Sequence, residues 1–221
     1  MAVKTLTNFK SKLTGGGARP NLFECNILFP SQALTGETDA ITWDANAQDE
    51  FQFLCKATSM PTQTIGSVDV PFRGRILKVA GDRTFEPWSV TVINDENFNV
   101  RRSFEKWAQK INNLSTGVGE VDPGKYMGKG MIHQLSRSIT RGITDIAGVD
   151  NQASKNKVVH SYQIEEIWPS EIGSIDLSYE SSDAIEEFTV TFQVQYTNSS
   201  TFNQDGVVQS IATSQNKDNT Q

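Results

Sequence analysis

The stretch FTVTFQVQY at residues 188–196 alternates strictly between apolar and polar side chains. Successive side chains of a β-strand point to opposite faces, so the alternation predicts a strand with one apolar and one polar face. The apolar members are Phe188, Val190, Phe192, Val194 and Tyr196. Such a strand requires a core on its apolar side and water or a polar partner on the other.

Other apolar runs, most of them with the same alternation, predict further strands. They lie at residues 22–29, 51–57, 68–72, 76–80, 88–92, 158–168 and 175–179. The runs on either side of Arg73 and Gly74 predict a β-hairpin with its turn at these two residues. Pro71 has no amide hydrogen to donate, which indicates an edge or bulge position in that hairpin.

One segment has helical periodicity. Its apolar stripe consists of Val100, Phe104, Trp107, Ala108 and Ile111, opposite charged side chains. This pattern predicts a helix that packs on a sheet, and Asn94 or Asp95 is expected to accept the free amide hydrogens at its start. The expected fold class is therefore mainly β, a β-sandwich or partly closed barrel with one flanking α-helix.

The chain is expected to form one domain with irregular additions. Residues 1–18 are polar and end in glycines, which predicts a flexible N-terminal arm before a β domain at 19–197. Residues of about 30–50 and 137–157 lack clear periodicity and are interpreted as insertions. Residues 198–221 are rich in Asn, Ser, Thr and Gln and predict a polar C-terminal tail that is mobile or serves in docking.

Charge and hydropathy narrow the class of partner. The 221-residue chain has a formal net charge of −6, which argues against a protein that grips nucleic acid through a basic stripe. No apolar run approaches the roughly 18 residues that span a bilayer, so no membrane insertion is expected. No apolar segment follows the N-terminal lysines, and the pattern therefore predicts a cytosolic product without a secretory signal.

The residues that most often carry chemistry show no supporting pattern. Cys25 and Cys55 share no metal-ligand spacing and lie in apolar, strand-like contexts, so buried free thiols are expected. A disulfide between them would require their strands to be neighbours. His133 and His160 have no Cys, Asp or Glu at ligand spacing. We therefore expect no catalytic residue, no cofactor and no metal site, and we do not expect an enzyme.

Five blocks of sequence occur in a specific order along the chain. They are ARPNLF at 18–23, FLCKATSMP at 53–61, VAGDRTFEPWSVTVINDE at 79–96, FEKW at 104–107 and IEEIWPSEIGSIDLSYESSDAIEEFTVTFQVQY at 164–196. Together they resemble the tail tube protein family of contractile-tailed, myovirus-type bacteriophages. The chain departs from the family pattern around 30–50, at 137–157 and after 198, so the resemblance says nothing about those segments.

The resemblance implies a structural virion protein that self-assembles. Six subunits are expected to form a hexamer whose sheet edges join into a continuous inner β-barrel, which removes the exposed edges that make a lone subunit prone to aggregation. The rings stack into a hollow tail tube through which DNA passes during ejection, without sequence-specific binding. Implied partners are the tail sheath, tape-measure, baseplate and tail-terminator proteins. The implied location is the virion tail, after assembly in the host cytoplasm, and the fold resembles type VI secretion tube proteins.

Individual residues receive roles as expectations. The hairpin tip at Arg73, Gly74 and Arg75 is basic in an acidic protein and is expected to reach acidic groups of the next ring. In the block GDRTF, Gly81 is expected to permit a sharp turn. Asp82 and Arg83 are expected either to form an ion pair that fixes this turn or to be solvated at the surface. The residues expected to pack sheet against helix are Trp88, Phe104, Trp107 and Trp168.

Polar strand faces are the candidates for the lining of the tube. These residues are Ser174, Asp176, Thr189, Gln193 and Gln195. An uncharged or acidic lining avoids contacts to phosphate and lets DNA slide. The sequence leaves open whether these faces instead meet the sheath or solvent.

Two other functions remain open from the sequence. A baseplate protein of the same fold that initiates the tube fits the same blocks, and copy number per particle would distinguish it. A monomeric β-barrel that binds a small ligand predicts an apolar cavity and a stable monomer. An enzyme that depends on His133 or His160 ranks behind both.

Overall fold

The computed structural model describes residues 5–13, 17–30, 47–139, 156–180, 183–202 and 208–210. Its elements are α1 (Leu6–Lys12), β1 (Phe23–Leu28), α2 (Ala47–Leu54), β2 (Cys55–Thr58), β3 (Gln63–Phe72), β4 (Arg75–Phe85), β5 (Trp88–Ile93), α3 (Asn99–Ile111), α4 (Pro123–Tyr126), β6 (Gly128–Ile139), β7 (Asn156–Ile172), β8 (Glu187–Gln193), β9 (Tyr196–Phe202) and β10 (Val208–Ser210). The chain divides into two compact units. Unit 1 comprises Met1–Glu24, Ile132–Ser161 and Ser199–Gln221, and unit 2 comprises Cys25–Met131 and Tyr162–Asn198.

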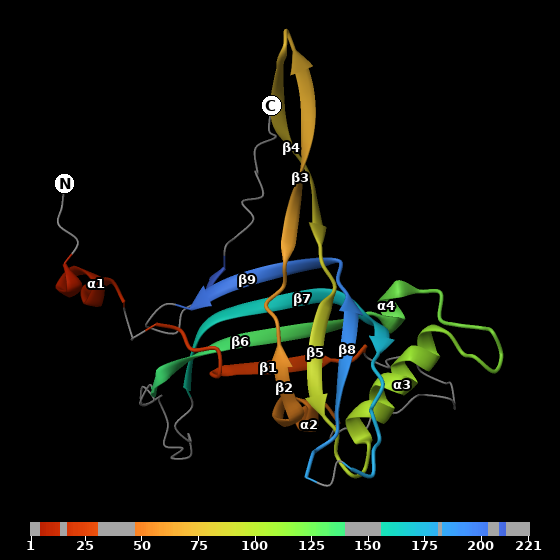
Figure 1. The fold of residues 1–221 in the computed structure, drawn as a ribbon. Helices are drawn as coiled ribbons and strands as arrows, with labels where there is room; N and C mark the ends of the chain where they lie inside the picture. The colour runs from red at the N-terminus through yellow and green to blue at the C-terminus, as the bar shows by residue number, and fades with distance from the viewer. Residues whose placement is uncertain are drawn as a thin grey trace, which may run out of the picture. The chain divides into compact units, whose positions relative to one another are not determined.

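Most of the described strands belong to one sheet. Its strand order is β1-β6-β7-β8-β5-β2, with β9 paired to β7 and β10 paired to β9 (Figure 1). Strands β3 and β4 form a separate antiparallel hairpin. The expectation of a mainly β protein is therefore confirmed, although the described residues contain four helices rather than one.

The core of unit 2 grows from the alternation that the sequence shows in β5 and β8. Trp88 lies opposite Phe192, Val90 opposite Val190 and Val92 opposite Phe188. All of these side chains are buried, because residues directly opposite in an antiparallel pair share one face of the sheet. The intervening residues of the two strands lie on the other face.

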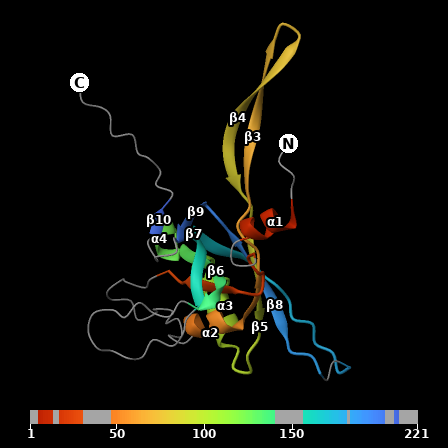
Figure 2. The ribbon, with the colours of Figure 1, turned by 90° about the vertical axis from the view of Figure 1, so that its left-hand side faces the viewer.

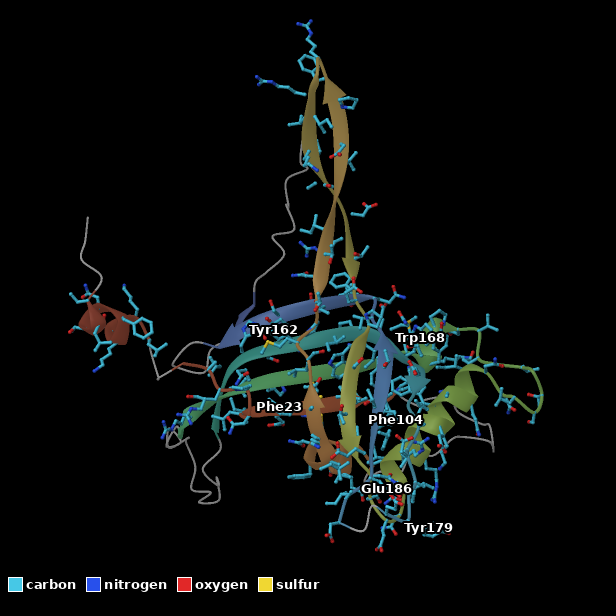
Figure 3. The ribbon with its side chains drawn as sticks, in the orientation of Figure 1. Phe23, Phe104, Tyr162, Trp168, Tyr179 and Glu186 are labelled. Carbon is cyan, nitrogen blue, oxygen red and sulfur yellow. The ribbon has the colours of Figure 1, made fainter. Side chains whose placement is uncertain are left out.

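Helix α3 covers the apolar face of these strands. Phe104 is fully buried, and its ring centroid lies 6.4 Å from that of Phe188 and 5.8 Å from that of Phe192. Figure 3 shows Phe104 on the side of α3 that faces the strands. Asp95 accepts the amide hydrogen of Asn97, which precedes the helix, at 3.2 Å, and that of Asn99, its first residue, at 3.4 Å; the N-cap residue is Phe98, which makes no side-chain cap hydrogen bond. The predicted helix is confirmed, and Asp95 accepts one of its free amide hydrogens as expected.

The strand expected at 51–57 is wrong in its first half. Residues up to Leu54 continue α2, and only Cys55–Thr58 form a strand. Ala47 and Phe51, four residues apart, are both buried on one face of α2, whereas Phe53 is exposed. Asp49 and Glu50 lie in the first turn, where negative charge favours the helix dipole.

Two further strand predictions are corrected, because one predicted strand is interrupted and the other is absent. The run at 188–196 is interrupted, because β8 ends at Gln193 and β9 begins at Tyr196. Residues 175–179 form no strand, and Tyr179 is fully exposed. The amide of Gly173 donates to the carbonyl oxygen of Thr189 at 2.7 Å just after β7 ends, and the chain then leaves the sheet.

The expected arm, insertions and tail contain regular structure where they are described. The arm includes α1, capped by Thr5, whose hydroxyl accepts the amide hydrogen of Asn8 at 3.3 Å. Strand β9 runs past residue 198, and Phe202 pairs with Val208 of β10. Strands β6 and β7 occupy the two ends of the 137–157 segment, and α2 occupies the end of the 30–50 segment. The rest of these segments lies outside the described residues.

Within unit 1, strand β6 is hydrogen-bonded to the residues that precede β1. The side-chain amide of Gln134 donates to the carbonyl oxygens of Arg19 and Leu22, at 2.9 and 2.7 Å. The amide of Leu135 donates to the Leu22 carbonyl oxygen at 2.9 Å. In the part of the chain that the structure describes, no helix is both long and apolar enough to cross a membrane.

Candidate assembly surfaces

The hairpin β3–β4 is the first candidate surface. Figures 1 and 2 show it as a two-stranded ribbon that extends beyond the strands of the sheet in unit 2. Every residue of β3 is exposed, and β4 is exposed except at Gly81 and Phe85. Neither strand has a second strand partner among the described residues. The hairpin predicted at 68–80 is thus confirmed and is longer at both strands.

One face of this hairpin is apolar. Val68 pairs with Val79 and Val70 with Leu77, and Phe72 lies on the same face beyond them. We call these five residues the hairpin apolar face. All five are exposed, with Phe72 at 66% of its accessible surface. On the other face Asp69 and Lys78 pair, with 3.5 Å between carboxylate oxygen and ammonium nitrogen.

The tip of the hairpin is basic and tightly turned. Arg73 and Gly74 have φ values of 44° and 82°, the two left-handed conformations that a two-residue hairpin turn requires. The guanidinium of Arg73 lies 5.4 Å from the centroid of the Phe72 ring. A cation at this distance over an aromatic face is weakly attracted to it, which orients Arg73 along the apolar face.

The block GDRTF lies within β4 and forms no turn, so that expectation is wrong. The register shifts between Ile65 and Ser67, where Gly66 faces Gly81 and Asp82 across a bulge. A Cβ at Gly81 would lie 3.3 Å from the Gly66 carbonyl oxygen, so the close approach of the two backbones favours glycine. Among the described ion pairs there is none between Asp82 and Arg83, which as neighbours on a strand point to opposite faces.

The second candidate surface is the polar face of β5 and β8. The hydroxyl oxygens of Ser89 and Thr191 lie 3.4 Å apart, and those of Thr91 and Thr189 lie 3.5 Å apart. We call these four residues the hydroxyl ladder. All four side chains are uncharged, and each pair lies directly opposite in the register of the two strands.

The expected lumen residues lie in three places. Thr189 belongs to the hydroxyl ladder, and Gln193 ends β8 with its side-chain amide 3.4 Å from the hydroxyl oxygen of Ser170. Gln195 lies between β8 and β9. Ser174 and Asp176 lie on the exposed segment that follows β7, so the structure does not bring them onto the polar face of β8.

The aromatic residues expected in the core also fall into two groups. Trp88, Phe104 and Trp107 are buried, and Trp107 donates its indole hydrogen to the carbonyl oxygen of Tyr126. Trp168 on β7 is only half-buried, and it lies opposite Gln193.

The two cysteines lie on strands that are not neighbours in the sheet. Cys25 of β1 and Cys55 of β2 are free thiols, and their mutual interaction raises the pKa of Cys25 and lowers the pKa of Cys55, although β1 and β2 stand at opposite ends of the strand order. No group of three or more Cys, His, Asp or Glu side chains suited to a metal ion occurs within the described ranges.

Comparison with solved structures defines the class of fold. The tube-terminating cap of the anti-feeding prophage superposes with a TM-score of 0.53 at 13% identity, covering 91% of this chain and 95% of that chain. A chain of the sheath-tube complex from an extracellular contractile injection system, PVC, superposes with a TM-score of 0.52 at 9% identity, covering 90% and 99%. The fold is therefore shared with components of contractile injection machines.

Sequence comparison identifies the family. Residues 18–200 match the family described as phage tail tube protein. Tail tube protein gp19 of Enterobacteria phage T4 is 28% identical over 183 residues, which cover 83% of this chain and 92% of that protein. This chain belongs to the phage tail tube protein family, which confirms the resemblance seen in the sequence. It is a structural protein of the contractile-tail class.

Proposed function

We propose that this chain forms six-membered rings that stack into the hollow tail tube of a virion, through which DNA passes during ejection. The single observation that carries the proposal is the hairpin apolar face, which is exposed along a ribbon with two open edges. A long, apolar strand edge of this kind is an aggregation hazard in a protein that functions alone. A neighbouring copy in the stack would cover both the apolar side chains and the open edges.

The energetics of this contact favour a nucleated assembly. Fully burying an exposed Val, Leu or Phe side chain contributes about 1.5–3 kcal/mol, and because these five side chains are about half exposed, burying the remainder contributes roughly 4–8 kcal/mol. Association of two proteins costs about 4–15 kcal/mol in lost translational and rotational freedom. The free energy gained at one hairpin contact is therefore similar to the cost of association. A subunit that joins a closed ring makes several contacts at once and gains more. We expect the isolated subunit to remain soluble until a ring or baseplate seeds growth.

The hydroxyl ladder is proposed to line the tube. Ser89, Thr91, Thr189 and Thr191 are uncharged, and the Lys56 ammonium at the end of this face is neutralised by an ion pair with Glu187. A lining without unpaired cations forms no ion pairs with phosphate, and DNA in transit would release no counterions on contact. In this arrangement the tape-measure protein and then DNA occupy the lumen. The sheath protein contacts the outer wall of the tube, and the baseplate and terminator proteins contact its ends. The tube is assembled in the host cytoplasm.

Electron microscopy of the concentrated, seeded full-length protein tests the proposal. We expect hollow cylinders with sixfold rings from the wild type. The double variant Val70→Asp/Leu77→Asp adds two charges to the hairpin apolar face and should remain unassembled. The matched control Ser67→Asp adds a charge to the opposite face of the same hairpin and should still assemble. Cylinders from the double variant, or none from the wild type, would remove the proposal.

A further inference from the structure

The segment between β7 and β8 combines exposed apolar side chains with negative charge. Residues 174–186, which we call the acidic loop, contain four carboxylates and no lysine, arginine or histidine. Leu177 and Ile185 are 79% and 71% exposed, and Tyr179 is fully exposed. Among the described ion pairs none involves a carboxylate of this loop. Neither its apolar side chains nor its negative charge is therefore matched within the described part of the chain.

Both ends of the acidic loop are fixed to the domain. The amide of Gly173 donates to the carbonyl oxygen of Thr189 at 2.7 Å, and the Gly173 carbonyl oxygen accepts a hydrogen from the guanidinium of Arg101 at 3.1 Å. At the other end, the carbonyl oxygen of Glu186 accepts the amide hydrogen of Asn94 at 2.8 Å, and its carboxylate accepts the side-chain amide of Asn94 at 2.9 Å. These bonds hold the loop beside the last residues of β5 and the first residues of β8.

The acidic loop and the hairpin β3–β4 lie at opposite ends of the same two strands. Strand β4 leads into the first residue of β5, Trp88. The acidic loop leads into the first residue of β8, Glu187, which pairs with the last residue of β5, Ile93. The hairpin therefore leaves one end of β5, and the loop lies at the other end. Figure 3 shows the hairpin above these strands, and Tyr179 and Glu186 below them.

The hairpin carries the opposite charge beside its own apolar surface. Phe72 and Arg75 pair directly in the register of β3 and β4, so they lie on the same face. The guanidinium of Arg73 lies 5.4 Å from the centroid of the Phe72 ring. Both arginines thus border the hairpin apolar face, and neither takes part in an ion pair among the described residues. One end of unit 2 presents apolar side chains with cations, and the other presents apolar side chains with carboxylates.

We propose that the hairpin apolar face of one copy binds the acidic loop of the next copy, with Arg73 and Arg75 paired to Asp176 and Glu180. Two different surfaces at opposite ends of one molecule make a head-to-tail contact, which repeats along an axis instead of closing as a pair. The inference rests on the proposed function, because this axis would be that of the tube, and it names the surface that receives the hairpin. Opposite charges at the two ends fix the direction in which copies stack.

Photo-crosslinking of the concentrated, seeded full-length protein tests the contact. Phe72→p-benzoylphenylalanine keeps an aromatic ring at the hairpin tip, and irradiation should join it to a peptide that contains the acidic loop. A mixture with isotope-labelled protein distinguishes links between two copies from links within one. Phe53→p-benzoylphenylalanine, at an exposed position of α2, is the control and should not yield this peptide. The proposal is overturned if the Phe72 position links within its own chain, links to another segment or forms no link.

An exchange of charges tests the ion pairs of the contact. Asp176→Arg/Glu180→Arg should raise the protein concentration needed for growth roughly 2–30-fold, and Arg73→Glu/Arg75→Glu should do the same, because each loses two exposed ion pairs. A chain with all four changes should regain the growth of the wild type, since opposite charges meet again. Sedimentation of assembled protein measures the recovery.

The matched control combines Arg73→Glu/Arg75→Glu with Glu86→Arg/Glu171→Arg, two exposed carboxylates of unit 2 outside the acidic loop. Its net charge equals that of the charge-exchanged chain, but its growth should stay weak. Equal recovery in both chains, or no recovery in the charge-exchanged chain, would overturn the pairing. Hollow cylinders whose links from Phe72 map elsewhere would remove this contact and leave the tube. Links to the acidic loop in assemblies that are not cylinders would remove the tube and leave this contact.

Discussion

Gly130 of β6 lies directly against the indole of Trp88 of β5, so that a Cβ at Gly130 would come within 2.7 Å of Trp88 Cζ3. Strands β6 and β5 are not neighbours in the sheet, so this contact crosses the core rather than the ladder. Trp88 is itself 1% exposed and cannot move outward without losing its hydrogen bond to Thr58. The absence of a side chain at Gly130 therefore makes room for the largest residue of β5.

Gly130→Ala should destabilise the subunit by about 1–3 kcal/mol, because an added methyl group overpacks this contact. The free energy of unfolding in urea measures the effect. Gly66→Ala on the hairpin is the matched control, since its nearest neighbour atom would lie at an ordinary 3.5 Å. Equal stability of the Gly130→Ala variant and wild type would show that Trp88 has room to shift.

Phe104→Ala should cost about 3–5 kcal/mol, because its ring joins α3 to Phe51 of α2 and to Phe188 of β8. Phe53→Ala makes the same chemical change at a side chain that is 82% exposed. That variant should stay within about 0.5 kcal/mol of wild type in the same measurement. Similar losses for both would contradict the burial pattern of α2 and α3.

Charge reversal at the hairpin tip tests the expected role of its basic residues. Arg73→Glu/Arg75→Glu should raise the protein concentration needed for tube growth, more strongly at low salt, because exposed ion pairs weaken with ionic strength. The unfolding temperature of the monomer should not change, since the tip is exposed. Lys10→Glu/Lys12→Glu on the exposed α1 makes the same change in net charge and should leave growth unaltered. Sedimentation of assembled protein across a salt series measures both.

A lysine on the hydroxyl ladder should convert the tube lining into a DNA-binding surface. Thr189→Lys would place one cation per subunit on the polar face of β8, and each phosphate contact adds to the salt dependence of binding. Co-sedimentation of assembled tubes with DNA fragments should then become strong at low salt and weak at high salt. Gln109→Lys, at an exposed position of α3, is the control. If both variants retain equal amounts of DNA, the ladder is not the lining.

The alkylation rate of Cys55 should depend on pH in a way set by Cys25. The hydrogen bond from Cys25 favours the Cys55 thiolate, so the rate with iodoacetamide should rise with pH and reach half its maximum below the ordinary pKa of 9.0. Cys25→Ala removes the donor and should shift the half-maximum upward. An unchanged profile in that variant would mean that Cys25 does not act on Cys55.

The local sequence pattern alone predicted those helices, strands and turns whose structure depends on a few adjacent residues. The alternation in β5 and β8, the helical stripe of α3 and the turn at Arg73 and Gly74 each depend on a few adjacent residues, and the structure has all of them. The hairpin tip and Thr189 were identified as surface candidates for the same reason. The family resemblance was also carried by the sequence blocks themselves.

Only the tertiary structure decided which distant residues meet. The alternation within one strand does not determine which strands pair, so the close approach of Gly130 to Trp88, on strands that are not neighbours, follows only from the tertiary structure. Over four residues, alternation does not distinguish a strand from one face of a helix, and the packing of Phe51 on Phe104 settled α2 as a helix. The bulge at Gly66 and Gly81 likewise depends on the partner strand. Periodicity fixes which face of an element is apolar, whereas the free energy of burying that face against particular partners fixes where the element lies.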